Sequence, residues 1–191
     1  EAAERGEPYD VVFLCNPNNP TGLLIDPKLL ERIVKKCRDC GVILVLDECF
    51  NGLLPDGETH SMKKRLDGTP NLFLLKAFTK LYAMAGLRLG YGLCADQKLL
   101  EKMHRVMQPW NVSIPAQEAG TAAMEEREFE QKSREYVARE LEFMKREFGR
   151  LGIPFYDSKA NYLFFEGPAD LYDCCGEEGI LIRDCSNYRG L

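Results

Sequence analysis

Short apolar runs in the first half of the chain predict strands that are buried on both faces. They occupy residues 10–15, 42–46 and 72–75, and none shows the alternation of a half-exposed strand. A fourth strand is predicted at residues 87–94. Because strands of this kind are typical of sheets covered by helices, we expect an α/β fold with a mostly parallel, doubly wound sheet that has helices on both faces.

Between the first two runs, apolar positions recur at helical spacing. One stripe contains Leu29, Leu30, Ile33, Val34 and Cys37. Asp26 suits the N-cap of this helix, Pro27 suits its first position, and Gly41 is placed to end it. A strand, a helix and a second strand within roughly forty residues predict a βαβ unit with parallel strands.

The remainder of the chain reads as mostly helical, followed by a small α+β unit. The expected elements are a long polar loop at 51–70, a short helix at 97–107, a break at 109–115, a helical stretch at 116–151 that is interrupted near 125–127, and strands at 161–165 and 180–182. The long helical stretch carries one apolar face, which indicates packing on a domain.

Composition excludes several classes of protein. The 191 residues are 45% apolar and 29% charged, as in an ordinary globular protein, and the net charge of −5 argues against a nucleic-acid or basic membrane surface. No apolar run approaches the ~20 residues of a membrane-spanning helix. Eight cysteines include a C-x-x-C pair, Cys37 and Cys40, but no second pair or histidine cluster completes a metal site. We therefore expect reduced thiols, no metal and a cytoplasmic protein.

Four polar features flank the predicted strands. A loop containing Asn19 follows the first strand, Asp47 follows the second, Lys80 follows the third, and Arg88 lies at the start of the fourth. In open α/β sheets the ligand crevice lies at the carboxyl ends of the strands. If the sheet is parallel, these side chains converge on one edge.

This set of side chains suits pyridoxal 5′-phosphate. The amine of Lys80 can form an imine with the cofactor, and a carboxylate such as Asp47 can keep the ring nitrogen protonated. Asn19 can donate to the 3-oxygen of the ring, and Arg88 can hold the phosphate through paired hydrogen bonds.

Three motifs carry a resemblance to a known family. They are NPNNPTG at 16–22, LDECF at 46–50 and AFTKLYAMAGLRLGY at 77–91. The chain resembles the fold-type-I pyridoxal-phosphate enzymes of the class I/II aminotransferase superfamily, in the branch of histidinol-phosphate aminotransferase and threonine-phosphate decarboxylase. The resemblance covers essentially the whole chain. It is specific because all three motifs occur in the family's order, whereas NPTG alone would be weak.

The resemblance implies a role for each matching residue. Lys80 is the catalytic residue that holds the cofactor as a Schiff base; the cofactor-binding residues are Asn19, Asp47, Phe50, Thr79, Lys80 and Arg88; and Asn161 and Arg183 lie on the substrate side. It also implies a homodimer that acts on an amino acid or phosphorylated amine, by transamination or decarboxylation. Residues 1–112 would belong to the large cofactor-binding domain, 113–151 to connecting helices and 152–191 to the small C-terminal domain.

Two positions depart from the family's pattern. Ala77 stands where many relatives have a serine that touches the phosphate, and Phe50 stands where aminotransferases usually have a tyrosine that donates to the cofactor. Together with the segment 185–188, Phe50 favours the decarboxylase branch.

Both ends of the sequence look cut, so we expect a fragment covering roughly the middle half of such an enzyme. The family's glycine-rich phosphate loop, its ring-stacking aromatic residue and its carboxylate-binding arginine would lie outside it. The alternative interpretation is a truncated, catalytically incompetent chain kept for packing or partner binding. A nucleotide-binding Rossmann domain is disfavoured because G-x-G-x-x-G does not follow the first strand.

Overall fold

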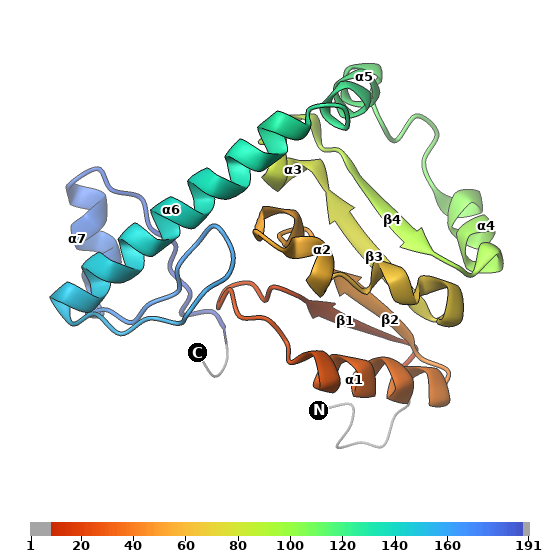
Figure 1. Ribbon diagram of the computed structural model, residues 1–191, viewed down its shortest axis with the longest axis horizontal. Helices are drawn as coiled ribbons and strands as arrows, with labels where there is room; N and C mark the ends of the chain where they lie inside the picture. Colours follow the sequence, from red (N-terminus) through yellow and green to blue (C-terminus); the bar gives the residue numbers. More distant parts are fainter. Residues whose placement is uncertain (1–8, 189–191) are drawn as a thin grey trace.

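The computed structural model describes residues 9–188, with Glu58 described by its backbone alone. Figure 1 shows a sheet flanked by helices, from which one long helix, α6, leads to the C-terminal segment and α7. In chain order the elements are β1 (Val11–Cys15), α1 (Pro27–Asp39), β2 (Ile43–Asp47), η1 (Asn51–Leu53), α2 (Gly57–His60), η2 (Met62–Gly68), β3 (Leu72–Ala77), α3 (Phe78–Leu81), η3 (Ala85–Leu87), β4 (Gly90–Cys94), α4 (Gln97–Val106), α5 (Ile114–Ala123), α6 (Arg127–Leu151) and α7 (Leu171–Glu177).

The sheet has the order β1-β2-β3-β4. β1, β2 and β3 run parallel, which confirms the α/β prediction, whereas β4 pairs antiparallel with β3. The fourth strand also begins at Gly90, later than residue 87, where the sequence placed it. Because β4 is reversed, its first residue lies beside Ala77, at the carboxyl end of β3.

Helix α1 forms as the sequence predicts. The Asp26 carboxylate accepts a hydrogen bond from the Leu29 N–H at 2.9 Å, Pro27 is the first helical residue, and Gly41 follows the helix with φ of +69°. Leu30, Val34 and Cys37 are the buried residues of this helix. They pack against Leu44, Leu46, Leu72 and Leu74 of the sheet to form the main core.

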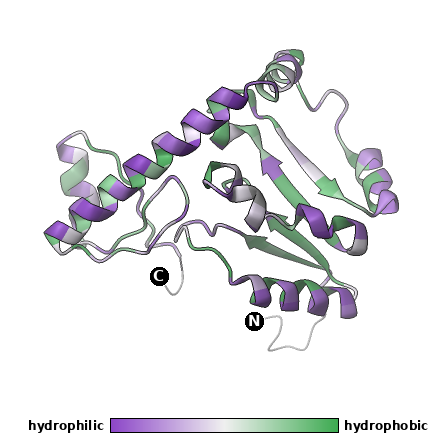
Figure 2. Ribbon diagram, in the orientation of Figure 1, coloured by the Kyte–Doolittle hydropathy of each residue, from purple (hydrophilic) through white to green (hydrophobic). Residues whose placement is uncertain are grey.

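Only one face of β1 contributes to this core, so the prediction that this strand is buried on both faces is wrong for the described chain. Val12 and Leu14 pack against it, while Val11 and Phe13 point the other way, and Phe13 is 70% exposed. In Figure 2 the three parallel strands are mostly hydrophobic, whereas α6 is hydrophilic along much of its length. A second layer of helices over Phe13, implied by a doubly wound sheet, does not occur among residues 9–188.

The helical half is as predicted, with α5 and α6 separated at residues 124–126. The loop expected at 51–70 instead contains η1, α2 and η2. None of the helices in the described part of the chain is long and apolar enough to cross a membrane.

The strands predicted at 161–165 and 180–182 do not form. A strand needs a neighbouring backbone, and within residues 9–188 the C-terminal segment offers only the isolated bridge between Phe155 and Phe165. The aromatic side chains of both residues pack on Phe148 of α6, at centroid distances of 6.3 and 4.9 Å. Their apolar character, which suggested strands, is used in packing against a helix.

Candidate functional site

The loop after β1 is held by its own asparagines. The Asn16 side chain accepts a hydrogen bond from the Ile25 N–H at 2.8 Å, and the Asn18 side chain accepts one from the Thr21 hydroxyl at 2.8 Å. The peptide bonds before Pro17 and Pro20 are cis. Asn19 is exposed on this fixed loop, which leaves its side chain accessible.

Asp47 ends β2 in the middle of the sheet edge. It pairs in register with Cys15 of β1 and Leu75 of β3, and it is half-buried. Its Oδ1 accepts a hydrogen bond from the Cys49 N–H at 2.9 Å. Burial, reinforced by the Asp47 carboxylate, raises the pKa of the Cys49 thiol to about 12, and burial likewise raises the pKa of Cys15. Both thiols beside the carboxylate are therefore neutral at pH 7.

The neighbouring carboxylate, Glu48, faces the opposite way. Its fully buried side chain forms an ion pair with Lys76 at 2.7 Å and accepts a hydrogen bond from the Ser61 hydroxyl at 2.7 Å. It also accepts a hydrogen bond from the Met62 N–H at 2.8 Å. Of the two adjacent acids, Glu48 thus has all its partners within the fold, whereas the Asp47 carboxylate is available to a ligand.

Lys80 lies on α3, the single helical turn that follows β3. It is exposed, and its Nζ lies 4.9 Å from the centre of the buried Phe50 ring. The charge of Lys80 lowers the pKa of the Cys49 thiol, against the larger effect of burial, which places the amine near the Asp47 end of β2. The fold therefore brings together an amine and a carboxylate that are 33 positions apart in the sequence.

Arg88 joins the same edge because β4 is antiparallel. It has a left-handed backbone (φ of 56°) just before β4, and its Nη1 donates a hydrogen bond to the Ala85 carbonyl at 2.8 Å. Had β4 been parallel, its start would lie at the opposite edge of the sheet, so the predicted convergence holds through a reversal of strand direction that the sequence did not reveal. Thr79 is half-buried on α3, and its hydroxyl makes no hydrogen bond within residues 9–188.

Within the described part of the chain, three ionic groups of this edge lack ion-pair partners. Among the described residues, no opposite charge lies within ion-pair distance of Asp47, Lys80 or Arg88. The more deeply buried carboxylates of Glu48 and Glu130, by contrast, each have a cationic partner. A half-buried carboxylate without a cation is unfavourable unless a ligand supplies one, so this arrangement is typical of a ligand site.

Asn161 and Arg183 lie in the C-terminal segment. Asn161 is exposed and adjoins Tyr162, whose hydroxyl donates to the Asn18 carbonyl at 2.7 Å. The exposed Arg183 donates to the Tyr188 hydroxyl at 3.2 Å. No hydrogen bond or ion pair within residues 9–188 joins Arg183 to Asp47 or Lys80.

Tyr162 is a site residue that the sequence did not identify. Its ring contacts the Phe50 ring edge-on at 5.0 Å, and burial, with the charges of Cys15, Asp47 and Tyr188, raises its pKa well above the usual value. Its contact with Asn18 joins residues 144 positions apart. Because one sequence contains no signal for so distant a contact, only its proximity to Asn161 could have suggested this role.

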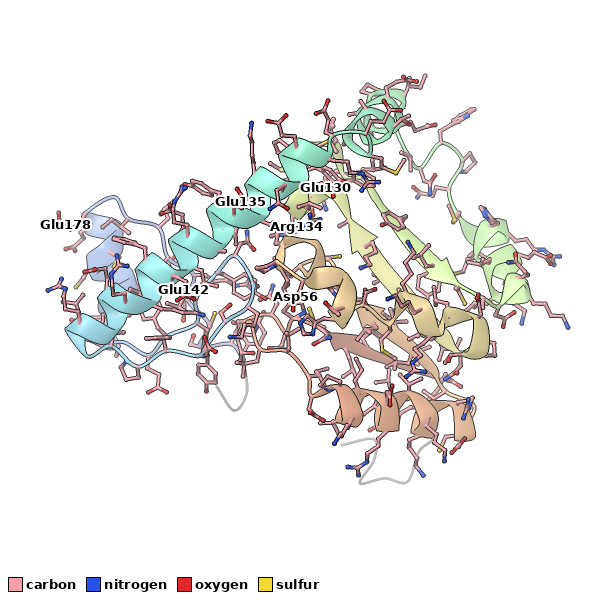
Figure 3. The ribbon with its side chains drawn as sticks, in the orientation of Figure 1. Asp56, Glu130, Arg134, Glu135, Glu142 and Glu178 are labelled. Carbon is pink, nitrogen blue, oxygen red and sulfur yellow. The ribbon has the colours of Figure 1, made fainter. Side chains whose placement is uncertain are left out.

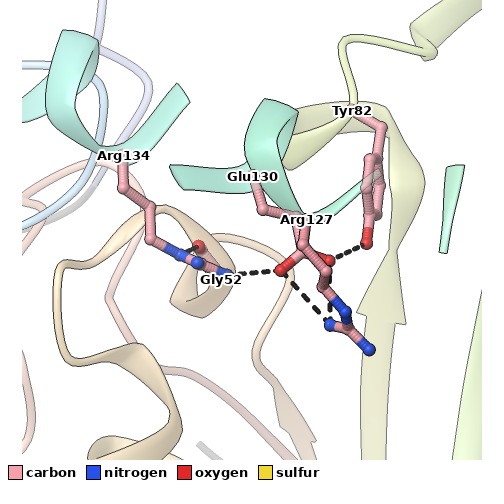
Figure 4. Close-up of polar contacts among 5 residues, drawn as sticks. All are labelled: Gly52, Tyr82, Arg127, Glu130 and Arg134. Carbon is pink, nitrogen blue, oxygen red and sulfur yellow. Dashed lines mark hydrogen bonds and ion pairs between the residues drawn. The ribbon is translucent and has the colours of Figure 1, made fainter. Parts of the chain in front are cut away.

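Glu130 and Arg134 of α6 were also missed, and they join two parts of the site. Figure 4 shows Glu130 between Tyr82 and Arg134, with Arg134 reaching the Gly52 carbonyl. In the sequence both residues look like ordinary charges on the solvent face of a helix.

Fold and site together define an α/β protein in which an amine, a carboxylate and a guanidinium meet at one edge of a mostly parallel sheet. The family model for aminotransferase class I and II matches residues 1–189. The chain therefore belongs to the class I and II aminotransferase family.

Individual relatives agree with this assignment. Threonine-phosphate decarboxylase from Salmonella typhimurium is 36% identical over 186 residues, covering 95% of this chain and 50% of the relative. Histidinol-phosphate aminotransferase from Nitratidesulfovibrio vulgaris is 33% identical, covering 97% of this chain and 50% of the relative. The crystal structure of histidinol-phosphate aminotransferase from Clostridium acetobutylicum superposes with a TM-score of 0.89 at 27% identity, covering 95% of this chain and 56% of that one. The chain spans about half the length of the curated relatives it matches.

Proposed function

We propose that this chain is the lysine-bearing part of a pyridoxal-phosphate enzyme that acts on an amino acid or a phosphorylated amine. The observation that carries the proposal is the set of three ionic groups, Asp47, Lys80 and Arg88, at one sheet edge without ion-pair partners among residues 9–188. A ligand with an electrophilic aldehyde, a basic ring nitrogen and a phosphate complements all three groups.

Each side chain would meet one part of the cofactor. Asp47 would hold the proton of the ring nitrogen, Arg88 would bind the phosphate through paired hydrogen bonds, and Asn19 would donate to the 3-oxygen. Phe50 and Thr79 would line the pocket. When bound, the cofactor supplies an electron-withdrawing ring that stabilises negative charge at the substrate Cα.

Lys80 has two tasks in this proposal. Its amine would hold the aldehyde of the cofactor, and once released by the substrate amine it would carry the proton at the substrate Cα. The aromatic ring of Phe50, whose centre lies 4.9 Å from Nζ, would help to orient this amine through a cation–π contact. Asn161 and Arg183 would bind the acidic group of the substrate.

Both transamination and decarboxylation fit these roles, and the relatives include enzymes named for each. Phe50 favours decarboxylation, because it cannot donate the hydrogen bond that a tyrosine at this position supplies. We also propose that the protein is a homodimer, as is usual in the family. A cytoplasmic location is consistent with the eight free cysteines.

Covalent capture tests the proposal. Purified chain is mixed with pyridoxal phosphate, scanned for a shifted absorbance band, reduced with borohydride and mapped by mass spectrometry. We expect labelling of Lys80 in the wild type and in Lys98→Ala, which removes an exposed lysine on α4, and none at this peptide in Lys80→Ala. Equal labelling of many lysines, unchanged in Lys80→Ala, would refute the cofactor site and support the incompetent-fragment alternative.

A further inference from the structure

A polar network joins α6 to the site from outside the pocket. The Glu130 side chain is 9% exposed, and its Oε1 accepts a hydrogen bond from the Tyr82 hydroxyl at 2.5 Å. Its Oε2 accepts one from Arg134 Nη2 at 3.1 Å, and Arg127 lies 3.3 Å from Oε1. Arg134 also donates through Nε to the Gly52 carbonyl at 2.8 Å. The Glu130 carboxylate and the Arg134 guanidinium are therefore each held by more than one hydrogen bond (Figure 4).

The two branches of this network end beside the proposed cofactor residues. Tyr82 follows Lys80 by two positions and caps α3, and Gly52 follows Phe50 by two positions in η1. Apolar contacts run in parallel, because Leu81 and Val137 pack on the cluster that contains Phe50 and Leu53. α6 thus contacts both the segment that carries the amine and the turn that carries the ring beneath it.

The arrangement of donors around one acceptor suits a residue that holds its neighbours in place. One carboxylate accepts hydrogen bonds from a tyrosine and two arginines, so its charge is compensated despite its burial. A buried carboxylate bonded in this way holds its partners in fixed directions, because moving any of them exposes an unsatisfied charge. A glutamate that only contributes charge to the surface would be exposed, whereas Glu130 is buried between α3 and the η1 turn.

We propose that Glu130 is a positioning residue that fixes the Lys80 segment against the Phe50–Gly52 turn through Tyr82 and Arg134. The fixing of the two segments stands on the fold alone, and its consequence for Lys80 rests on the proposed function. In this arrangement α6 sets the direction from which the Lys80 amine meets the cofactor. The acceptor must be ionised and must reach both branches at once, as only Glu130 does among the acidic residues of α6.

Three variants separate the branches, with a fourth as control. Glu130→Gln disturbs both branches, Tyr82→Phe removes only the α3 branch, and Arg134→Lys removes only the bond to Gly52. Glu135→Gln is the matched control, because Glu135 is exposed on the same helix, where its hydrogen bond comes from Gln131 (Figure 3).

Hydrogen exchange on the chain without cofactor is the first measurement. The amides of Leu53 and Leu54 report on the turn, and the amides of Ala83 and Met84 report on α3, since all four donate backbone hydrogen bonds. We expect about tenfold faster exchange at both places in Glu130→Gln, at α3 alone in Tyr82→Phe and at the turn alone in Arg134→Lys, as for loss of one buried hydrogen bond. Glu135→Gln should match the wild type.

Capture of pyridoxal phosphate by Lys80 is the second measurement. Glu130→Gln should keep the full binding capacity but capture the cofactor about tenfold more slowly at saturation, because the amine is less well directed. A merely destabilising change would lower capacity and leave the rate constant of the folded fraction unchanged, which would overturn the positioning role. Exchange in Glu130→Gln and Tyr82→Phe equal to that in Glu135→Gln would also overturn it. Failure of the wild type to capture cofactor, with the exchange pattern intact, would refute the proposed function and leave the fixing of the two segments standing.

Discussion

Two adjacent acids at the end of β2 show how environment divides roles between residues of the same chemistry. Asp47 is half-buried with its carboxylate near neutral thiols and Lys80, whereas Glu48 is fully buried and paired with Lys76. Alternation along the strand sends one side chain to each face of the sheet. The sequence contains both acids side by side, but only packing shows which one is available to a ligand.

Replacement of Asp47 by its amide should therefore weaken cofactor binding without much loss of stability, and replacement of Glu48 should do the reverse. Asp47→Asn removes a charge that a protonated ring nitrogen would need, so we expect about thirtyfold weaker binding of pyridoxal phosphate, as for one charge-assisted hydrogen bond. Stability should change little, because asparagine still accepts the Cys49 N–H. Absorbance titration with the cofactor measures the affinity, and urea unfolding measures the stability.

Glu48→Gln is the contrasting variant. It leaves the Lys76 ammonium buried without its counter-charge, which typically costs about 3–5 kcal/mol of unfolding free energy. Urea unfolding should show this loss, and residual folded protein should bind the cofactor with wild-type affinity. Similar stability losses in both variants would contradict the division of roles.

The Tyr82–Glu130 pair makes stability depend on pH at both extremes. Burial raises the pKa of Glu130, but hydrogen bonds from Tyr82 and Arg134 outweigh it and hold that pKa below 4.5. A depressed acid pKa gives stability that is complete above pH 4.5 and lost as the pH falls through the folded value. Burial and the Glu130 carboxylate raise the pKa of Tyr82 from 10.0 to about 12, so its contribution is complete below pH 10 and lost as the pH rises toward 12.

We therefore expect the stability difference between the wild type and Tyr82→Phe to form a plateau. It should stay constant at about 1.5–3 kcal/mol between pH 4.5 and pH 10, the worth of a hydrogen bond to a charged group, and shrink on both sides. Urea unfolding across this range measures it. A difference that is flat from pH 3 to pH 11 would show that the hydroxyl does not interact with an ionised Glu130.

At the scale of elements, a close contact fixes the NPNNPTG loop to the C-terminal segment. Gly22 has φ of +70°, and a Cβ there would lie 1.9 Å from the Ser158 hydroxyl oxygen. The Gly22 carbonyl also accepts a hydrogen bond from the Lys159 N–H at 2.8 Å. The glycine is thus required both by its backbone conformation and by the approach of a second segment.

Gly22→Ala should destabilise the chain by about 2–4 kcal/mol, since backbone strain and overpacking add. Gly41→Ala is the control, because Gly41 has the same left-handed backbone, with φ of +69°, but no described residue beyond its two chain neighbours lies within 4 Å of the place that an alanine methyl group would take. It should cost only about 1 kcal/mol. Thermal and urea unfolding compare the two; equal losses would mean that the Ser158 contact carries no energy.

Elements with strong local patterns were predictable, and those defined by partners were not. β1, α1 and β2 follow from continuous apolar runs, a helical stripe and its caps, all local properties. The direction of β4 depends on which neighbour it pairs with, and residues 161–165 lack a strand because their aromatic residues pack on α6. The same reason applies to the candidate site: motifs predicted Asp47, Lys80 and Arg88 as candidate residues, whereas Tyr162 and Glu130 adjoin it only through contacts distant in sequence.

At the scale of the whole molecule, packing divides the described chain into a well-anchored sheet and a weakly anchored end. Leu44, Leu46, Leu72 and Leu74 have no solvent exposure. Residues 167–188, by contrast, make backbone hydrogen bonds only with residues of the same stretch, as far as the described chain shows. Their one helix, α7, has seven residues. Helices this short depend on tertiary contacts for stability, yet Tyr172 and Leu181 are exposed.

Native-state hydrogen exchange should reveal this division. Amides in 167–188 should exchange at least about a hundredfold faster than those of β2 and β3, because their opening requires no disruption of the sheet core. Arg183 lies in this region and is one of the two residues proposed to bind the acidic group of the substrate. A phosphorylated amino acid added with the cofactor should therefore slow exchange in 180–188 in the wild type but not in Arg183→Gln. Exchange of the whole chain at one rate would show that the C-terminal segment is part of a single cooperative unit and is not ordered by its ligand.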